Sequence, residues 1–191
     1  TSESIRNIGV SDDGSRIFLL TSYSSDTSYG DLYTVDIIDG QIGSASLLDT
    51  NVGTRRIFFA EDNRLCYFKY IDTDLVAGDL YIDGEAIDSG VQLYSLTFLE
   101  DGSVLYRSDI DFTGSGTLKL YDAEIESLTL ADFVSDYLVV SGGRILCLVD
   151  EDPEYVTDTL YVWRDDELTF VDDDVLALIP VSDRTVYDLQ D

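Results

Sequence analysis

A repeat of about 40 residues is the feature that most constrains what this chain can fold into. A turn followed by a β-rich run recurs along it, as SDDGSRIFLL from Ser11, EDNRLCYF from Glu61, EDGSVLYR from Glu100, SGGRILCL from Ser141 and SDRTVYDL from Ser182. The first four copies continue into a second apolar run, which starts at Gly30, Gly78, Gly116 and Asp158, and then into a short run that ends at Val52, Val91, Val134 and Val175. A repeat of this length predicts an array of similar units that bury their faces against one another.

Each copy has the pattern of four β-strands. The residues between turns are β-branched, aromatic or leucine, and stretches such as 31–35 alternate between apolar and polar. Pairs such as Asp39-Gly40 and Asp83-Gly84 supply the positive φ angles of tight hairpins. A four-stranded unit repeated near 40 residues is typical of a β-propeller blade, whereas a β-sandwich has no reason to repeat the same turn and strand sequences at fixed spacing.

We therefore predict an all-β fold, a β-propeller or propeller fragment, with about four complete four-stranded antiparallel blades and a partial fifth. We expect a single domain over 1–191, with repeats at approximately 5–52, 53–91, 92–134, 135–175 and 176–191, the last one partial. The ring thus lacks its closing strands, and open sheet edges are unfavourable. The expectation is a fragment of a larger propeller, rearranged ends, or a partner chain that completes the ring.

Composition excludes several classes of function. The chain carries 39 acidic residues against 11 basic ones, a net charge of −28, and no histidine. Catalytic units and zinc sites that need histidine are therefore excluded, and two cysteines cannot form a thiolate cluster. The negative field disfavours nucleic acid, and no apolar run reaches the roughly 18 residues that cross a bilayer. We expect no nucleic-acid partner, no membrane insertion by this segment and no catalytic residue.

The run S-D-D-G-S-R-I-F-L-L-T-S, with G-D-L-Y-T-V-D and L-L-D-T-N-V behind it, resembles the repeat of TolB-type propellers. These form a WD-repeat-like family of bacterial envelope and peptidase-associated proteins. The resemblance covers nearly the whole chain and weakens where Lys119 replaces a tyrosine and where Gly142-Gly143 replaces Asp-Gly. It implies a propeller that binds a protein or peptide, or that gates access to a separate catalytic domain.

The expected function is a non-catalytic binding or scaffolding module, which presents an acidic loop face to a protein, peptide or glycan partner. The alternative is an accessory propeller domain of a hydrolase, a peptidase or glycosidase, whose catalytic residues lie outside this chain. An extracytoplasmic location, in a cell-envelope or secreted protein, is expected from the resemblance and from the acidic, lysine-poor surface. The two unpaired cysteines are also compatible with the cytoplasm.

The loops between second and third strands carry repeated D-x-D pairs. Their members are Asp72 and Asp74, Asp109 and Asp111, and Asp150 and Asp152, with Asp26 in the first copy. Calcium takes six to eight oxygen ligands, so these pairs are candidate calcium ligands. None has the D-x-D-x-D-G run of a dedicated calcium loop, and loop aspartates often cap turns through backbone N–H groups instead.

Other patterns have structural explanations. Ile87-Asp88-Ser89-Gly90 is similar to an aspartic-protease motif, but only one copy exists and the repeat itself accounts for it. No motif selects a glycosidase pair of carboxylates. Cys66 and Cys147 lie in apolar runs two units apart, which predicts two reduced, buried thiols. The aromatic residues of the third strands, Tyr33, Tyr81, Tyr161 and Trp163, are expected to pack between blades.

Overall fold

The computed structural model describes residues 4–24, 28–60, 62–122, 126–140, 143–150, 157–164 and 167–179. Within these ranges every helix or strand element is a β-strand. The first sheet contains β1 (Asn7–Val10), β2 (Arg16–Ser24), β3 (Tyr29–Ile38), β4 (Gln41–Ile42) and β5 (Ser46–Gly53). The second contains β6 (Ile57–Phe59), β7 (Leu65–Asp72), β8 (Ala77–Ile82) and β9 (Glu85–Gln92). The third contains β10 (Thr97–Phe98), β11 (Val104–Ser108), β12 (Gly116–Asp122), β13 (Glu126–Val140), β14 (Arg144–Val149), β15 (Asp158–Arg164) and β16 (Glu167–Val175).

The seven-stranded third sheet differs from the predicted succession of separate four-stranded blades. Strand β13 pairs with β12 through its first half and with β14 through its second half. Phe133 has a φ of +57°, and the register shifts between Val134 and Asp136, so the strand changes partners at a bulge without ending. We call β1–β5 unit 1, β6–β9 unit 2, β10–β12 with the first half of β13 unit 3, and the second half of β13 with β14–β16 unit 4.

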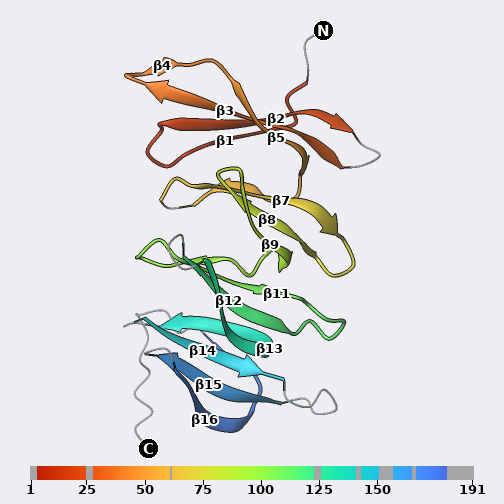
Figure 1. Ribbon diagram of the computed structural model, residues 1–191, viewed down its shortest axis with the longest axis vertical. Helices are drawn as coiled ribbons and strands as arrows, with labels where there is room; N and C mark the ends of the chain where they lie inside the picture. The colour runs from red at the N-terminus through yellow and green to blue at the C-terminus, as the bar shows by residue number, and fades with distance from the viewer. Residues whose placement is uncertain are drawn as a thin grey trace, which may run out of the picture.

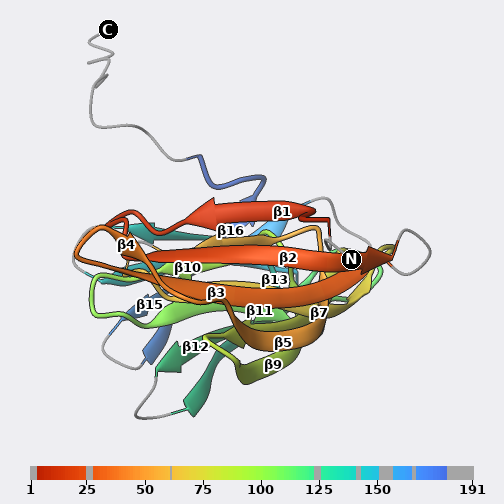
Figure 2. The same ribbon diagram turned by 90° about the horizontal axis from the view of Figure 1, so that it is seen from above.

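The four units lie one after another along the long axis of the molecule, with units 1 and 4 at opposite ends (Figure 1). Viewed from above, the strands of unit 1 lie over those of the units beneath (Figure 2). The described residues thus form an all-β, propeller-like stack of curled antiparallel sheets that is open at both ends. Residues 176–179 are described and form no strand, and the rest of the predicted partial fifth repeat lies outside the described residues.

One backbone feature recurs in all four units. The last strand of each unit has a residue with positive φ directly before its terminal valine: Asn51, Gly90, Phe133 and Asp174, at +57°, +62°, +57° and +56°. The register to the third strand shifts close by in every case. A bulge bends the strand and turns the next side chain, and Val52, Val91 and Val134 are fully buried behind it. The repeated run that ends in valine therefore encodes a repeated bulge.

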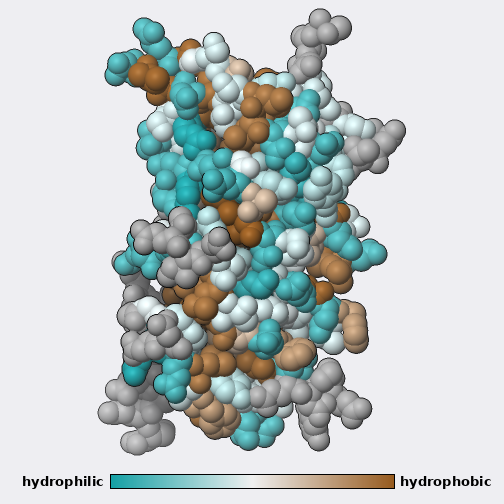
Figure 3. All heavy atoms as spheres, in the orientation of Figure 1, coloured by the Kyte–Doolittle hydropathy of each residue, from teal (hydrophilic) through white to brown (hydrophobic). Residues whose placement is uncertain are grey.

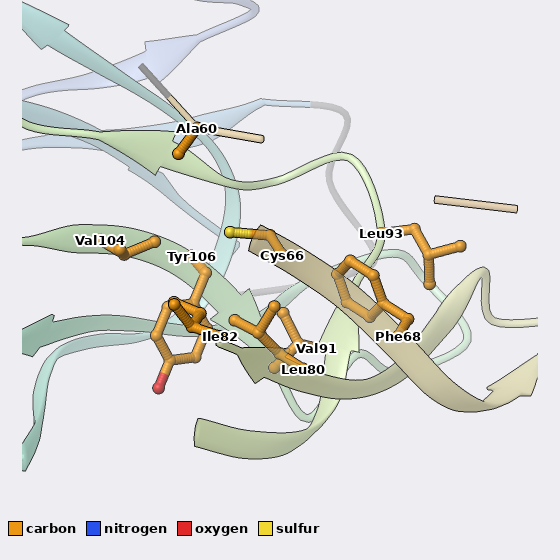
Figure 4. Close-up of a cluster of buried hydrophobic side chains, with 9 residues drawn as sticks. All are labelled: Ala60, Cys66, Phe68, Leu80, Ile82, Val91, Leu93, Val104 and Tyr106. Carbon is orange, nitrogen blue, oxygen red and sulfur yellow. The ribbon is translucent and has the colours of Figure 1, made fainter. Parts of the chain in front are cut away.

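The hydrophobic core lies between the units, in one cluster at each boundary. Figure 4 shows the middle cluster, which joins units 2 and 3 through Ala60, Cys66, Phe68, Leu80, Ile82, Val91, Leu93, Val104 and Tyr106. Cys66 belongs to it and Cys147 to the cluster between units 3 and 4. Both thiols are free and buried, as predicted, and burial raises the pKa of each to about 12. Tyr81, Tyr161 and Trp163 pack against these clusters, which confirms their expected role, whereas Tyr33 belongs to none of the three clusters.

Candidate functional site

The β7–β8 and β11–β12 loops project from the same edge of the stack, on the right in Figure 1. In the first loop, Asp72 Oδ1 accepts hydrogen bonds from the backbone N–H groups of Asp74, at 2.8 Å, and Leu75, at 3.1 Å. This is the turn-capping geometry that competes with metal binding for the same oxygen. Asp72 therefore fixes the shape of its loop, while Asp74 is exposed.

Asp111 has the same role in the second loop. Its Oδ1 accepts from the hydroxyl and the N–H of Thr113, at 2.6 and 2.8 Å, and from the N–H groups of Gly114 and Ser115, both at 3.1 Å. The hydroxyl bond of Thr113, together with these backbone bonds, holds the pKa of Asp111 below its usual value. Asp111 is thus an ionised cap that makes the loop rigid.

The structure brings only some of the predicted calcium ligands near one another, and it does so across units. Asp72 and Asp109 line one hollow of about 260 Å³ between units 2 and 3. Asp150 accepts from the Ser115 hydroxyl at 3.3 Å, beside the Asp111 cap. Asp26 and Asp152 lie outside the described residues. Across the part of the chain that the structure describes, no group of three acidic or thiol side chains is placed to hold a metal ion, and calcium binding stays a prediction.

Exposed large side chains accompany the carboxylates of these loops. Phe112, at the tip of the β11–β12 loop, is 95% exposed, and Tyr70 and Tyr94 are 63% and 65% exposed. Figure 3 shows hydrophobic residues set among hydrophilic ones along one face of the stack. We call the surface formed by the two loops the loop face; its members are Tyr70, Asp72, Leu75 and Asp109, which line the hollow, and Phe112 of the second loop. The sequence indicated its acids, but nothing in the pattern distinguished its exposed aromatics from core residues.

Sequence reasoning also missed a polar latch between units 1 and 2. Asp49 on β5 accepts from Lys69 Nζ at 2.9 Å and from the Tyr67 hydroxyl at 2.8 Å, both on β7 of the next unit. Burial would raise the pKa of Asp49, but these two hydrogen bonds outweigh it and hold the pKa below its usual value. Burial would likewise lower the pKa of Lys69, and the bond to Asp49 raises it above its usual value.

The latch recurs between units 2 and 3 with a different lysine. Asp88 accepts from Lys119 Nζ at 2.8 Å and from the Tyr106 hydroxyl at 3.1 Å. Lys119 lies on the third strand of its unit, at the position where the repeat has tyrosine, and also reaches Asp109 at 3.3 Å. Asp88 of the protease-like Ile87-Asp88-Ser89-Gly90 string is therefore the acid of an ion pair, at the position in the repeat that Asp49 has in unit 1. The repeat aligns Asp49 with Asp88, but it could not identify both latches, because Lys69 lies on the second strand of its unit and Lys119 on the third strand of its own.

The comparisons with known proteins bear on the fold. No family model matches the chain, and neither does any curated protein, so the resemblance to TolB-type propellers stays a prediction. A solved eukaryotic initiation factor is similar at a TM-score of 0.53 and 15% identity, over 85% of this chain and 41% of that one. A puromycin-hydrolysing peptidase of Mycobacterium tuberculosis is similar at 0.49 and 11%, over 95% and 30% of the two chains. The acylaminoacyl peptidase of Pyrococcus horikoshii gives 0.48 and 12%, over 91% and 33%.

At these identities, structural likeness concerns the fold alone. The chain spans half or less of the length of the solved proteins it resembles. None of the described elements is a helix with the length and apolarity to cross a membrane.

Proposed function

We propose that the chain is a non-catalytic binding or scaffolding module whose loop face receives a protein, peptide or glycan partner. The observation that carries this proposal is the exposure of Phe112 on a loop that Asp111 caps through four hydrogen bonds. An aromatic ring held in water on a rigid loop gains free energy when a partner covers it. The surrounding carboxylates favour basic groups on that partner. An extracytoplasmic location is part of the proposal and is supported by the acidic, lysine-poor composition.

The test is a calorimetric titration with a peptide of alternating lysine and leucine, and with a neutral hexasaccharide, at fixed ionic strength. Saturable binding of either probe identifies its class, and Phe112→Ala should weaken it about tenfold, because truncation of a central aromatic costs more than about 1 kcal/mol. Phe170→Ala is the matched control, because Phe170 is also exposed, at 56%, but lies on β16, away from the loop face. Binding that is absent, or equally weakened by both variants, would contradict the proposal.

The alternative is the accessory propeller domain of a hydrolase whose catalytic residues lie outside this chain. It fits a chain that spans half or less of the solved proteins it resembles. Under this alternative, Phe112→Ala in the full-length protein should change KM for a large substrate and leave kcat for a small one unchanged. Under the main proposal the full-length protein shows no hydrolysis for the variant to change.

A further inference from the structure

An arginine crosses the boundary between units 1 and 2 at the edge opposite the loop face. Arg16 is the first residue of β2, and its Nη1 donates to Asp83 Oδ1 at 2.9 Å and to the Asn63 carbonyl at 3.2 Å. Its guanidinium carbon lies 5.5 Å from the centre of the Phe59 ring. The side chain therefore fills the space between the two units and pairs with a turn, an acid and an aromatic ring of unit 2.

Arg64 repeats this contact between units 2 and 3. It stands directly before β7, donates through Nη2 to the Gly102 carbonyl and lies 5.8 Å from the centre of the Phe98 ring. Its Nε also donates to Asp62 Oδ2 at 2.6 Å, in the turn of its own unit. Two successive boundaries are thus closed by the same residue type, at the same place in the repeat, on an equivalent carbonyl and an equivalent ring. The acid differs, because Arg16 pairs with Asp83 of the next unit and Arg64 with Asp62 of its own turn.

The third boundary has serine at this place. Ser103 stands before β11 as Arg64 stands before β7, and its short side chain bonds to Asp101 of its own turn at 2.6 Å. A groove of about 620 Å³ opens there between units 3 and 4. It is lined by Thr97, Phe98, Leu99, Glu100, Asp101, Leu120, Val139, Val140, Gly143, Ile145 and Trp163.

Strand register shows that this groove occupies the place of the missing arginine. Val139 pairs with Ile145 as Phe98 pairs with Val104, so Val139 is the equivalent of the ring under Arg64. Gly143 directly precedes Arg144, as Gly102 precedes Ser103, so it is the equivalent of the acceptor turn. Asp101 corresponds to Asp62, because each accepts from the N–H two residues later. All three equivalents line the groove.

We propose that the groove between units 3 and 4 binds an arginine side chain of a partner protein or peptide, which supplies the guanidinium that Arg16 and Arg64 supply at the other boundaries. The aliphatic stem would lie along Leu120 and Val139, and the head would meet Asp101 at the rim. The hydroxyl and the N–H of Ser103 both donate to Oδ1 of Asp101 and hold the pKa of this carboxyl below its usual value, so the rim is charged at neutral pH.

Arginine fits the groove better than lysine. Its planar guanidinium donates to a carbonyl and a carboxylate at once and stacks on an aromatic face, whereas an ammonium is a compact, strongly hydrated charge. Trp163 supplies such a face on the unit 4 wall. A partner with an exposed arginine is therefore selected over one with lysine by geometry, beyond the general attraction of a chain with a net charge of −28.

This inference goes beyond the proposed function, because it concerns a second surface. Asp101 lies before β11 and Asp109 after it, so the groove and the loop face are at opposite ends of this strand. A partner that used both would contact two edges of the stack. Phe112→Ala leaves the groove intact and Ser103→Arg leaves the loop face intact, so failure of one proposal is distinguishable from failure of the other.

The experiment is a fluorescence titration of the purified chain with N-acetyl-arginine methylamide, at fixed ionic strength. Trp163 is the only tryptophan in the sequence and lines the groove, so its emission reports occupancy directly. We expect a saturable change with arginine and an affinity at least about tenfold lower for N-acetyl-lysine methylamide. Ser103→Arg should abolish the titration, because the chain's own side chain then fills the site. Asp101→Asn should weaken it about tenfold.

Ser44→Arg is the matched control, since Ser44 is exposed in unit 1 and the charge change is the same; it should titrate like the wild type. Asp101→Asn keeps the test decisive if Ser103→Arg does not fold, because it removes the rim charge and adds no volume to the groove. A linear response, equal affinities for the two probes, or full binding by folded Ser103→Arg or by Asp101→Asn would each overturn the proposal.

Discussion

The boundaries between units 1 and 2 and between units 2 and 3 contrast with the boundary between units 3 and 4. Each of the first two has a latch of one aspartate, one tyrosine and one lysine, and an arginine at the turn edge. At the third boundary, Ala131 stands at the position of Asp49 and Asp88, because it pairs with the third strand as they do. Cys147 stands where the latch has tyrosine, and Ser103 where the edge has arginine.

The difference shows that the latch is gained or lost as a set. An aspartate at position 131 without its tyrosine and lysine would be a buried, unpaired charge, so acid and donors are absent together. The third boundary has other polar contacts, since Arg107 donates to the carbonyls of Val134 and Ser135 and the Tyr137 hydroxyl to that of Leu105. These contacts lie along β13, the strand that units 3 and 4 share. A continuous strand thus joins this pair of units where side-chain latches join the others.

The strongest way to break the contrast is Ala131→Asp. It places a carboxylate in a cluster where the side chain is 7% exposed and faces no lysine, and should destabilise the fold by about 3–5 kcal/mol. Urea unfolding at pH 7 measures the loss. Ala86→Asp, at an exposed position of β9, is the control and should change stability by no more than about 0.5 kcal/mol.

A second variant makes this prediction specific to the latch. Tyr161 pairs with β14 as Lys119 pairs with β11, so Tyr161→Lys should recover part of the stability lost in Ala131→Asp. The same lysine in the wild-type background should be destabilising. If the two changes simply add, the contrast between the boundaries does not depend on charge pairing.

Removal of the Asp49 latch is the next largest expected effect. Asp49→Ala leaves the ammonium of Lys69 and the hydroxyl of Tyr67 without their acceptor. The side chain of Asp49 is 19% exposed and that of Lys69 is 11% exposed, so water replaces the acceptor poorly. We expect a loss of about 2 kcal/mol. Asp88→Ala should cost less, because Lys119 keeps Asp109 as a partner. A double-mutant cycle of Asp49→Ala with Lys69→Met should show favourable coupling, and its absence would reduce the latch to a packing contact.

The ion pair between units 1 and 2 should contribute to stability in a pH-dependent way that a variant of Asp49 can isolate. The folded pKa of Asp49 lies below its usual value of 3.8, so its contribution is present above that pH and is lost as the pH falls through the folded pKa. The folded pKa of Lys69 lies above 10.5, so its contribution is lost only at higher pH. The stability difference between wild type and Asp49→Asn should therefore be constant from pH 5 to 9 and shrink below pH 4. A difference that persists at pH 2 would show that charge is not its cause.

Much of this arrangement was predictable from the repeat, and the reason is physical. Turn chemistry and alternation act over two to six residues, so the strands and the tight turns at Asp39-Gly40 and Asp83-Gly84, which have positive φ at both residues, follow from local sequence. The valine that closes each unit was visible, but the bulge before it was not, because residues as different as Asn51 and Phe133 adopt the same φ.

The candidate site was less predictable because it depends on contacts between units. The D-x-D pattern predicted ion ligands. In the structure, backbone N–H groups of the same loops donate to Oδ1 of Asp72 and of Asp111. The groove beside Ser103 exists because the third boundary has serine where the other two have arginine. Sequence alone could not predict it, because only the structure shows that Arg64 fills the equivalent space at its own boundary. The continuity of β13 was invisible, since a turn signal is weak where Phe133 and Val134 both suit a strand.

Two substitutions that exchange arginine and serine between the second and third boundaries should change the folding free energy by less than loss of the Asp49 latch does. Removal of the arginine should destabilise the fold, and its addition should stabilise it. Arg64→Ser removes charged hydrogen bonds to Gly102 and Asp62 and should cost about 1.5 kcal/mol. Ser103→Arg should add about 0.5–1 kcal/mol, because it fills the groove and reaches equivalent acceptors. Melting temperatures of the two variants, with Ser44→Arg as the charge control, test the exchange. A loss of stability in Ser103→Arg as large as that in Arg64→Ser would show that the third boundary cannot accommodate an arginine at this position.

The smallest expected effect is a difference in the rate at which the boundaries open. Cys66 lies in the cluster between units 2 and 3 and Cys147 in the cluster between units 3 and 4, and both are fully buried with a pKa of about 12, so either thiol reacts only when its boundary opens. The second boundary has a latch and an arginine that the third lacks. If the latch and the arginine contribute together about 1.4 kcal/mol to local stability, iodoacetamide should label Cys147 about tenfold faster than Cys66 under native conditions.

Mass spectrometry of the separated peptides measures the ratio of the two labelling rates, and Asp88→Ala should reduce this ratio by accelerating the labelling of Cys66 alone. Equal rates in the wild type would mean that the shared strand β13 holds units 3 and 4 together as firmly as the latches hold the others.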